Sequence, residues 1–268
     1  MASTDKKAPP KHHDMIQRGI KDPSPVGTAT FIGLRLLDPL LQYGILAKGW
    51  GSSTLHALGL ETLPAGAPTT TGTPIDALGL SPYRLILLAM SAATAAKHAW
   101  WVSGPRQERF DVGAALIVAA YNAAANSANA LAFTTQALSA SLAGDGAFPQ
   151  VPLVLGAALF VVGLAVEVVA EAQRARFKAD PKNKGRPFTG GLFAYARHVN
   201  YTGYTLWRAG YALAAGGWVW AAGTVLLHGS DFALRAVPAL SDYCERTYGE
   251  EWLRYTQQTP YKLIPYVY

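Results

Sequence analysis

The residues best suited to chemistry lie in one stretch, residues 171–204, which reads EAQRARFKADPKNKGRPFTGGLFAYARHVNYTGY. Its basic half ends near Arg186 and leads, through two glycines, to a group of aromatic and polar side chains: Tyr195, Arg197, His198, Asn200 and Tyr201. Arg binds phosphate groups, Asn pairs with an amide, and aromatic rings stack on planar rings. The stretch predicts a site for a large anionic cofactor with a flat reactive ring. Its basic half also suits attachment to anionic lipids.

The C-terminal tail repeats this combination of charged and aromatic residues. Its segment DYCERTYGEEWLRYTQQTPYKLIP carries Glu245, Arg246, Tyr248, Tyr255 and Lys262. The charge pattern described below places the tail on the same side of a membrane as residues 171–198, so we expect it to contribute to the same site.

Glu167 and Glu171 close an apolar run and are four residues apart, so they share one face of a helix. Two carboxylates at this position predict a ligand for cofactor or substrate at the mouth of a cavity. The alternative is structural, namely ion pairing with Arg174 or Arg208.

Polar side chains also interrupt other apolar runs, and a polar group at membrane depth is costly enough to suggest function. Asn122, Asn126 and Asn129 follow i, i+4, i+7 spacing and lie close to Tyr121. This stripe fits the lining of a pocket and hydrogen bonding between helices equally well.

Two further pairs of polar residues favour structural roles. Lys97 and His98 precede a Trp-Trp pair, a pattern typical of cations that snorkel towards a membrane interface. Arg35 and Asp38 are three residues apart and are expected to pair with each other.

Membrane helices must position these residues. Half of the 268 residues are hydrophobic and 15% are charged, whereas an ordinary soluble domain has roughly 25% charged residues. Six windows approach the roughly 20 apolar residues that a membrane-crossing helix needs: 28–50, 81–103, 111–142, 151–170, 199–215 and 218–240. We predict an all-α, multi-pass transmembrane helical bundle of about six spans (six to seven), rather than a soluble protein with buried helices.

Lys and Arg occur in every second connection between these windows. They occupy the N-terminal arm, residues 103–110, residues 172–198 and the tail, whereas residues 49–80, residues 143–150 and the Gly216-Gly217 turn have none. The positive-inside rule therefore predicts that both termini are cytosolic. The net charge of +6 is then a topology signal and argues against a nucleic-acid partner. One Cys and six scattered His give no metal site, and the absence of GxGxxG excludes a Rossmann unit.

Three motifs connect the chain to a known family. GGLFAYARHVNYTGY, the preceding EAQRARFKADPKNKG and the closing TYGEEWLRYTQQTPYKLIPYVY resemble signatures of the steroid 5α-reductase-like membrane proteins, especially the DUF1295 branch. The resemblance covers about residues 150–268. RHP-type motifs also occur in isoprenylcysteine carboxyl methyltransferases, whose C-terminal core is related.

The apolar windows and the charge pattern divide the chain, and the resemblance implies the function of its last part and a cofactor. Residues 1–27 would be a disordered cytosolic arm, 28–149 N-terminal transmembrane helices with a lumenal loop at 51–80, and 150–268 a reductase-like domain. The family's reductases take NADPH from the cytosol and reduce an activated C=C bond of a lipid, typically a 3-oxo-4-ene steroid. In a eukaryotic cell, this implies the endoplasmic reticulum membrane.

The family's cofactor contacts carry over by position. Glu167 and Glu171 match the cofactor-contacting helix, and Lys178 falls where a basic group faces the cofactor. Residues that match the nicotinamide side are Tyr195, Asn200 and Tyr201, and those in the tail that closes over the adenosine phosphate end are Arg246, Tyr248 and Lys262.

The chain departs from the family pattern at four places. Val199 replaces a Pro, Tyr204 replaces a Glu, and Arg208 replaces a small residue. Residues 94–98 lack the Tyr that, in the steroid enzymes, works with a Glu to polarise the substrate ketone. The last departure argues against steroid specificity.

Three functions follow as hypotheses. The first is an NADPH-dependent reductase of a lipid, sterol or terpenoid enone, in which a side chain donates a hydrogen bond to the carbonyl oxygen during hydride transfer. Candidates for this donor are Tyr121, His98, Tyr204 and Glu167. The second is an S-adenosylmethionine-dependent methyltransferase, and the third is a non-catalytic lipid-binding protein. The Asn-Tyr of RHVNY and the KADPKNKG stretch favour the first.

Overall fold

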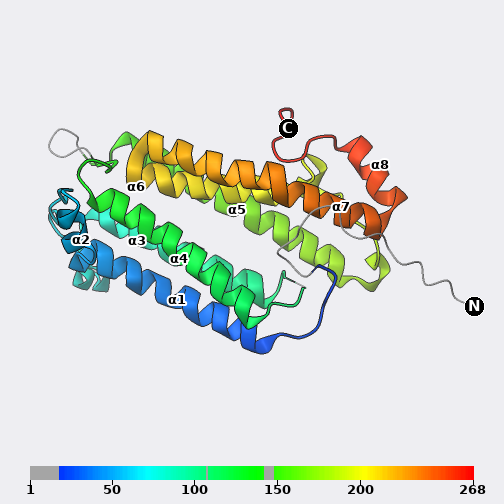
Figure 1. Ribbon diagram of the computed structural model, residues 1–268, viewed down its shortest axis with the longest axis horizontal. Helices are drawn as coiled ribbons and strands as arrows, with labels where there is room; N and C mark the ends of the chain where they lie inside the picture. The colour runs from blue at the N-terminus through cyan, green and yellow to red at the C-terminus, as the bar shows by residue number, and fades with distance from the viewer. Residues whose placement is uncertain (1–17, 107, 142–147) are drawn as a thin grey trace, which may run out of the picture.

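The computed structural model describes residues 18–106, 108–141 and 148–268. These residues form helices and no β-strand, so the predicted all-α class is confirmed (Figure 1). The helices are α1 (Pro25–Lys48), α2 (Ser52–Ala57), α3 (Pro82–Ser103), α4 (Val112–Thr134), α5 (Val151–Ala179), α6 (Val199–Asp231), α7 (Val237–Tyr248) and α8 (Glu250–Gln258). Short helical turns are η1 (Pro74–Leu78), η2 (Pro181–Asn183), η3 (Gly191–Ala194) and the π-helical η4 (Phe232–Ala236).

The long helices run back and forth along one axis. Helix α1 packs against α3 and α4, while α5 packs along α6, and the two groups meet over fewer residues. Figure 1 shows α2 at one end of the bundle and α7 and α8 at the other. The start of α1, the α3–α4 connection and the α5–α6 connection all lie at the α8 end. We call this the basic end, because it carries the Lys- and Arg-rich connections.

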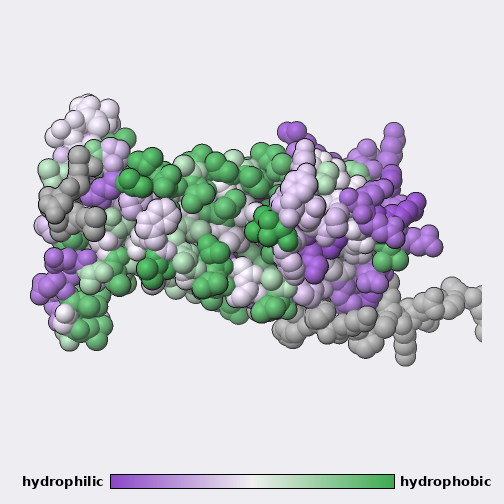
Figure 2. Space-filling view, turned by 90° about the horizontal axis from the view of Figure 1, so that it is seen from above, coloured by the Kyte–Doolittle hydropathy of each residue, from purple (hydrophilic) through white to green (hydrophobic). Residues whose placement is uncertain are grey.

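By length and composition, three helical segments of the described chain could cross a membrane: Pro82–Ser103, Val151–Ala179 and Val199–Tyr248. Figure 2 shows apolar side chains along the middle of one face, between more hydrophilic ends. Helices α1 and α4 are not among these segments, because their apolar runs are interrupted by polar residues. Helix α1 carries Arg35 and Asp38, and α4 carries the three-Asn stripe. The predicted window 111–142 is also longer than its helix, because α4 ends at Thr134 and Thr135 pairs with Thr62.

A chain reversal divides α6 at the predicted Gly216-Gly217 turn. Gly217 has φ 72° and ψ −165°, a conformation that glycine adopts without strain. Residues 199–216 form the first arm of α6, and residues 218–231 form the second arm, which returns beside it (Figure 1). The second arm continues through η4 into α7, so it brings the C-terminal tail back to the basic end.

Glycines let α5 and the first arm of α6 approach closely. A Cβ added to Gly163 would lie 2.4 Å from the backbone nitrogen of Trp207, and one on Gly210 would lie 2.4 Å from that of Phe160. Gly156 and Gly203 are similarly restricted. Small residues at a helix–helix interface are a common packing device in membrane proteins. This contact fixes the position of Glu167 and Glu171 relative to Asn200 and Trp207.

Candidate functional site

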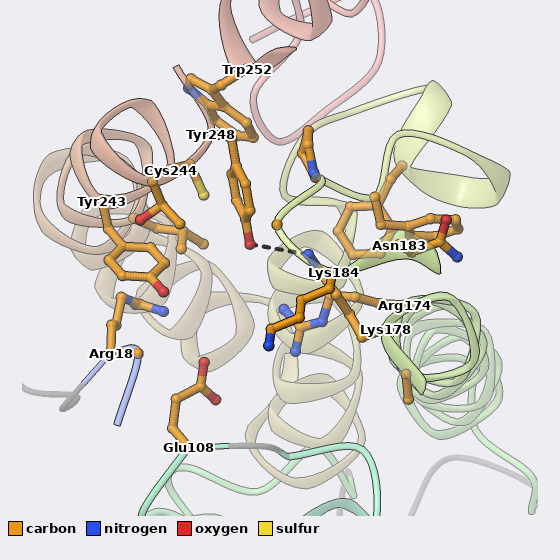
Figure 3. Close-up of a pocket in the computed structure, with 18 of the residues that line it drawn as sticks. Arg18, Glu108, Arg174, Lys178, Asn183, Lys184, Tyr243, Cys244, Tyr248 and Trp252 are labelled. Carbon is orange, nitrogen blue, oxygen red and sulfur yellow. Dashed lines mark hydrogen bonds between the residues drawn. The ribbon is translucent and has the colours of Figure 1, made fainter. Parts of the chain in front are cut away.

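A cavity of about 470 Å³ opens at the basic end of the bundle (Figure 3). Its walls come from residues 18–21, the α3–α4 connection, the last turns of α5, the loop after α5, and helices α7 and α8. The volume lies within the range of small-molecule and cofactor sites, roughly 300–1,000 Å³. The site is thus built from segments that are far apart in the sequence.

The lining of the cavity is predominantly basic. Two carboxylates, Glu108 and Asp180, lie among six cationic residues: Arg18, Lys21, Arg174, Lys178, Lys184 and Arg197. The ammonium of Lys178 donates a hydrogen bond to the hydroxyl of Tyr248 at 3.1 Å, drawn as the dashed line in Figure 3. It also donates to the carbonyl of Arg186. Such a lining suits an anionic ligand, and phosphate groups in particular.

Aromatic side chains form the other part of the lining. They are Phe188, Phe193, Tyr243, Tyr248, Trp252 and Tyr255. The hydroxyl of Tyr255 donates to the carbonyl of Phe193 at 2.6 Å and so ties α8 to the loop before α6. Flat rings in fixed positions offer stacking surfaces to a planar ligand ring.

A buried carboxylate supports the lining where α5 meets α6. Glu171 accepts a hydrogen bond from Asn200 at 2.9 Å and forms an ion pair with Arg174 at 2.6 Å. Asn200 and Arg174 both line the cavity. Glu171 therefore holds two cavity-lining side chains in place, and the predicted ion pair with Arg174 is confirmed.

His198 lies at the start of α6, almost wholly buried. Burial, reinforced by the charges of Arg197 and other cations, lowers its pKa to about 3. The imidazole is therefore neutral at physiological pH and adds no positive charge to the cavity. Its backbone nitrogen donates to the carbonyl of Lys262 at 2.8 Å, which attaches the C-terminal tail to the site.

Five predicted cofactor residues line the cavity: Lys178, Arg197, His198, Asn200 and Tyr248. Two others lie beneath it. Glu171 is described above, and Tyr201 stacks between His198 and Phe232, with ring centres 5.7 and 4.5 Å away.

Three of the remaining predicted side chains have partners elsewhere, and a fourth is exposed. Arg186 is 3.7 Å from Glu251, and Arg246 is 3.1 Å from Asp242. The ammonium of Lys262 donates to the hydroxyl of Tyr268, and Tyr195 is exposed.

Several lining residues were not among the sequence candidates. Tyr243 and Trp252 belong to the tail segment, and their regular placement on α7 and α8 could have indicated a shared face. Arg18 and Lys21 were not predicted as site residues, because they lie within the arm of residues 1–27 that the sequence predicts to be disordered. Most of that arm, including residues 1–17, lies outside the described residues.

Inside the bundle, a second set of charged side chains is paired. Lys97 of α3 donates to Glu167 of α5 at 2.5 Å, and the indole of Trp207 donates to the other oxygen of Glu167 at 2.6 Å. Lys97 and His98 are 7% and 4% exposed, so the expectation that they snorkel to an interface is wrong. Lys97 points inward because it pairs with the carboxylate of Glu167 there. This partner lies on another helix, so the local sequence spacing does not reveal it.

The predicted Arg35–Asp38 pair is confirmed, at 3.2 Å. Arg35 also donates to His98 at 3.2 Å, and Asp38 accepts a hydrogen bond from Asn126 at 2.6 Å. The Asn stripe thus takes part in hydrogen bonding between helices. We call the set formed by Arg35, Asp38, Lys97, His98 and Glu167 the polar interior.

Two of the predicted donor candidates, Tyr121 and Tyr204, lie together near Arg208 and His228. The hydroxyl of Tyr121 is 2.7 Å from Nε2 of His228, and Arg208 donates to the hydroxyl of Tyr204 at 3.0 Å. His98 and Glu167, the other two candidates, belong to the polar interior. His228 was not singled out in the sequence, since it is isolated in an apolar run.

The described residues contain no group of three or more His, Cys, Asp or Glu side chains placed to hold a metal ion. The fold and the cavity define a helical protein with a cavity lined mainly by cationic and aromatic side chains at one end.

Comparison with known proteins identifies the family. Residues 116–259 match the family described as a protein of unknown function, DUF1295, and the chain belongs to this family. It is 42% identical over 243 residues to a protein named "Probable O-methyltransferase ustE" from Ustilaginoidea virens, which covers 90% of this chain and 86% of that protein.

Two sterol reductases are more distantly similar. The 7-dehydrocholesterol reductase of Danio rerio is 29% identical over 86 residues, 32% of this chain and 18% of the reductase. The Delta(14)-sterol reductase erg24 of Schizosaccharomyces pombe is 32% identical over 120 residues, 37% of this chain and 26% of the reductase. The chain thus spans a small part of each of these reductases.

Proposed function

We propose that this protein is a membrane-embedded, NADPH-dependent reductase of the activated C=C bond of a lipophilic enone. The observation that carries the proposal is the lining of the cavity, in which six cationic side chains surround a set of aromatic rings. This donor set suits a ligand with several phosphates and flat rings. The similarity to two sterol reductases supports the same chemistry.

The lining residues divide into two groups by chemistry. Lys178, Lys184 and Arg18 would hold phosphate groups as charge-assisted hydrogen-bond donors. Asn200, held by Glu171, would offer its amide to the carboxamide of the nicotinamide. NADPH supplies the hydride when bound. The protein orients the ring and the alkene, which is where much of the rate of such a reaction originates.

The membrane arrangement belongs to the same proposal. Helices α1, α3, α4 and α5 and the two arms of α6 would make six spans, with the basic end in the cytosol. The N-terminal helices and the α5–α8 region would be the two structural units. Three apolar helical segments and the alternating course of the chain support this arrangement. A lipophilic substrate would reach the protein from the bilayer, in the endoplasmic reticulum of a eukaryotic cell.

A methyltransferase is the second candidate, favoured by the 42% identity to a protein named as a probable O-methyltransferase. S-adenosylmethionine would require the same cavity to accept a ligand that has no phosphate and carries a positive sulfonium. A lining with six cations and two carboxylates does not favour such a ligand electrostatically. The lining of the cavity therefore favours the reductase over the methyltransferase.

Transfer of deuterium tests the proposal. Purified protein would be incubated with NADPH deuterated at the transferable C4 position and a mixed set of steroid and terpenoid enones. We expect a product that retains one deuterium at the former β-carbon. Methylated products formed from S-adenosylmethionine would support the second candidate, and the absence of both products would favour a lipid-binding protein without catalysis.

A further inference from the structure

Arg208 is a cation buried inside the bundle, 2% exposed, and its partners are neutral. Its guanidinium donates to the hydroxyl of Tyr204 at 3.0 Å, to Asn126 at 3.3 Å and to Asn122. The ring of Trp207 lies 4.4 Å from its centre. No carboxylate of the described residues forms an ion pair with it.

Two other buried cations differ in this respect, because Arg35 pairs with Asp38 and Lys97 pairs with Glu167. A third, Arg84, donates to backbone carbonyls at the far end of the bundle. A buried charge without a counter-ion is costly. Arg208 would therefore stabilise a neighbouring group that becomes negative.

The hydrogen bonds next to Arg208 all run in one direction. Arginine can only donate, so the oxygen of Tyr204 accepts from Arg208 and the hydroxyl hydrogen of Tyr204 is directed to another acceptor. At the other end, Nδ1 of His228 lies 2.9 Å from the carbonyl of Thr224, which can only accept. Nδ1 therefore carries the hydrogen, and Nε2 accepts from the hydroxyl of Tyr121.

The oxygen of Tyr121 is left as an acceptor beside Tyr204, with which its hydroxyl interacts. The single hydroxyl hydrogen of Tyr204 is therefore directed to Tyr121, and at this place an incoming carbonyl oxygen would accept it instead of Tyr121.

This place can be reached from outside the bundle. Tyr121 is 45% exposed, and its neighbours Leu116 and Ile117 on the outer surface of α4 are exposed as well. Tyr121 is nine residues after the first residue of α4, about 13 Å along the helix from the basic end. A ligand dissolved among lipid chains would meet the Tyr121 phenol without any separation of helices.

The same place is connected to the cavity by a series of ring contacts. The rings of His198 and Tyr201 are 5.7 Å apart, those of Tyr201 and Phe232 are 4.5 Å apart, and those of Phe232 and Tyr204 are 5.5 Å apart. His198 and Asn200 line the cavity, and Tyr204 follows Asn200 by one helical turn. A ligand at Tyr204 therefore lies next to the inner end of the cavity.

We propose that Tyr204 binds the carbonyl oxygen of a lipophilic enone that enters from the bilayer between α4 and the second arm of α6, at a site completed by Tyr121, Arg208 and His228. This inference rests on the proposed reductase function and names where its substrate binds. Tyr204 donates the hydrogen bond to the carbonyl. Arg208 is a positioning residue that acts through Tyr204.

The chemistry balances without a further reagent. Hydride from NADPH adds to the β-carbon, the electron pair of the C=C bond moves towards the carbonyl, and an enolate forms whose oxygen is negative. Tyr204 and Arg208 stabilise that oxygen at the moment it acquires charge. A solvent proton then adds to the α-carbon and gives the saturated ketone.

Photolabelling locates the substrate. A 3-oxo-4-ene steroid and a terpenoid enone, each carrying a diazirine, would be irradiated with the full-length protein and NADPH, and the labelled peptides mapped. We expect label on residues 112–134 or 218–236 that an excess of unlabelled enone displaces. Removing one hydrogen bond in Tyr204→Phe should reduce this label about fivefold to tenfold.

Tyr43→Phe is the matched control. Tyr43 lies on α1, and its hydroxyl donates to the carbonyl of Leu78, far from Tyr204 in the chain. Its label should equal that of the unaltered protein. In turnover assays, Arg208→Gln should lower kcat about a hundredfold and change KM little, because Arg208 acts when charge develops, and Arg208→Lys should restore part of kcat.

The two proposals fail separately. Label on the α1–α3 side, or label on Tyr204→Phe equal to that on the unaltered protein, overturns the proposed substrate site. If NADPH raises the thermal stability of the protein in the same experiment, the reductase proposal is still supported. Displaceable label at residues 112–134 or 218–236 without NADPH stabilisation supports the site and contradicts the reductase. An absence of displaceable label overturns the site.

Discussion

The cavity at the basic end and the polar interior use charged residues in opposite ways. In the cavity, cations outnumber carboxylates and surround about 470 Å³ of open space. In the polar interior, Arg35 and Lys97 each have a carboxylate within hydrogen-bonding distance and almost no exposure. The comparison separates charges that line open space from charges enclosed between helices.

One of the interior pairs also connects parts of the bundle that otherwise touch little. Lys97 belongs to α3 and Glu167 to α5, so this pair joins the N-terminal helices to the α5–α6 pair. Loss of an interior charge should therefore affect stability, whereas loss of a cavity charge should affect binding. Each prediction below tests that separation.

The largest effect is expected at the interior pair. Lys97→Met leaves Glu167 buried without its cation, which should lower the free energy of unfolding by about 3–5 kcal/mol. Chemical denaturation of the purified protein in detergent measures this change. The double variant Lys97→Met with Glu167→Gln removes the stranded charge and keeps an acceptor for Trp207. It should regain much of the loss, and a double variant no more stable than the single one would contradict the account.

A smaller effect, on binding alone, is expected in the cavity. Lys178→Met removes one charge-assisted donor and should weaken NADPH binding by about 1.5–3 kcal/mol, roughly tenfold to a hundredfold. Titration calorimetry measures the affinity, and the unfolding midpoint without ligand should not change. Lys48→Met, at the opposite end of the bundle, is the control and should bind normally. A Lys178→Met protein that unfolds early would place Lys178 among the structural charges instead.

The smallest effect concerns His198, at the boundary between the two regions. Its pKa is about 3 in the folded protein, below its ordinary value of 6.5, so the unfolded chain binds a proton that the folded chain does not. Stability contributed by His198 is present above pH 6.5 and is lost as pH falls towards 3, by at most about 1.4 kcal/mol per pH unit. Unfolding midpoints between pH 7 and pH 4.5 measure this slope. His198→Gln should reduce the slope, and an unchanged slope would show that other groups produce it.

Much of the fold could be predicted, because long apolar windows leave few choices. The window 81–103 corresponds to α3, and Pro82 begins that helix, as Pro commonly does in a first turn. Helix α5 continues nine residues beyond its window, through EAQRARFKA, since these residues favour helix. That extension brings Arg174 and Lys178 to the cavity.

The candidate site could be predicted only in part. Lys178, Asn200 and Tyr248 lie in recognisable motifs, and all three line the cavity. The partner of Lys97 is 70 residues away, and no local pattern specifies such a contact. Arg208 looked like a departure from a motif, and its neutral surroundings became visible only in three dimensions.

Thermal stabilisation of the purified full-length protein by NADPH and by S-adenosylmethionine tests the central claim most directly. A ligand that binds the folded state raises stability by RT ln(1 + [L]/Kd), so equal concentrations compare the two affinities. The account predicts a clear rise of the unfolding midpoint with NADPH that is reduced in Lys178→Met, and little change with S-adenosylmethionine. A rise with S-adenosylmethionine and none with NADPH would contradict it.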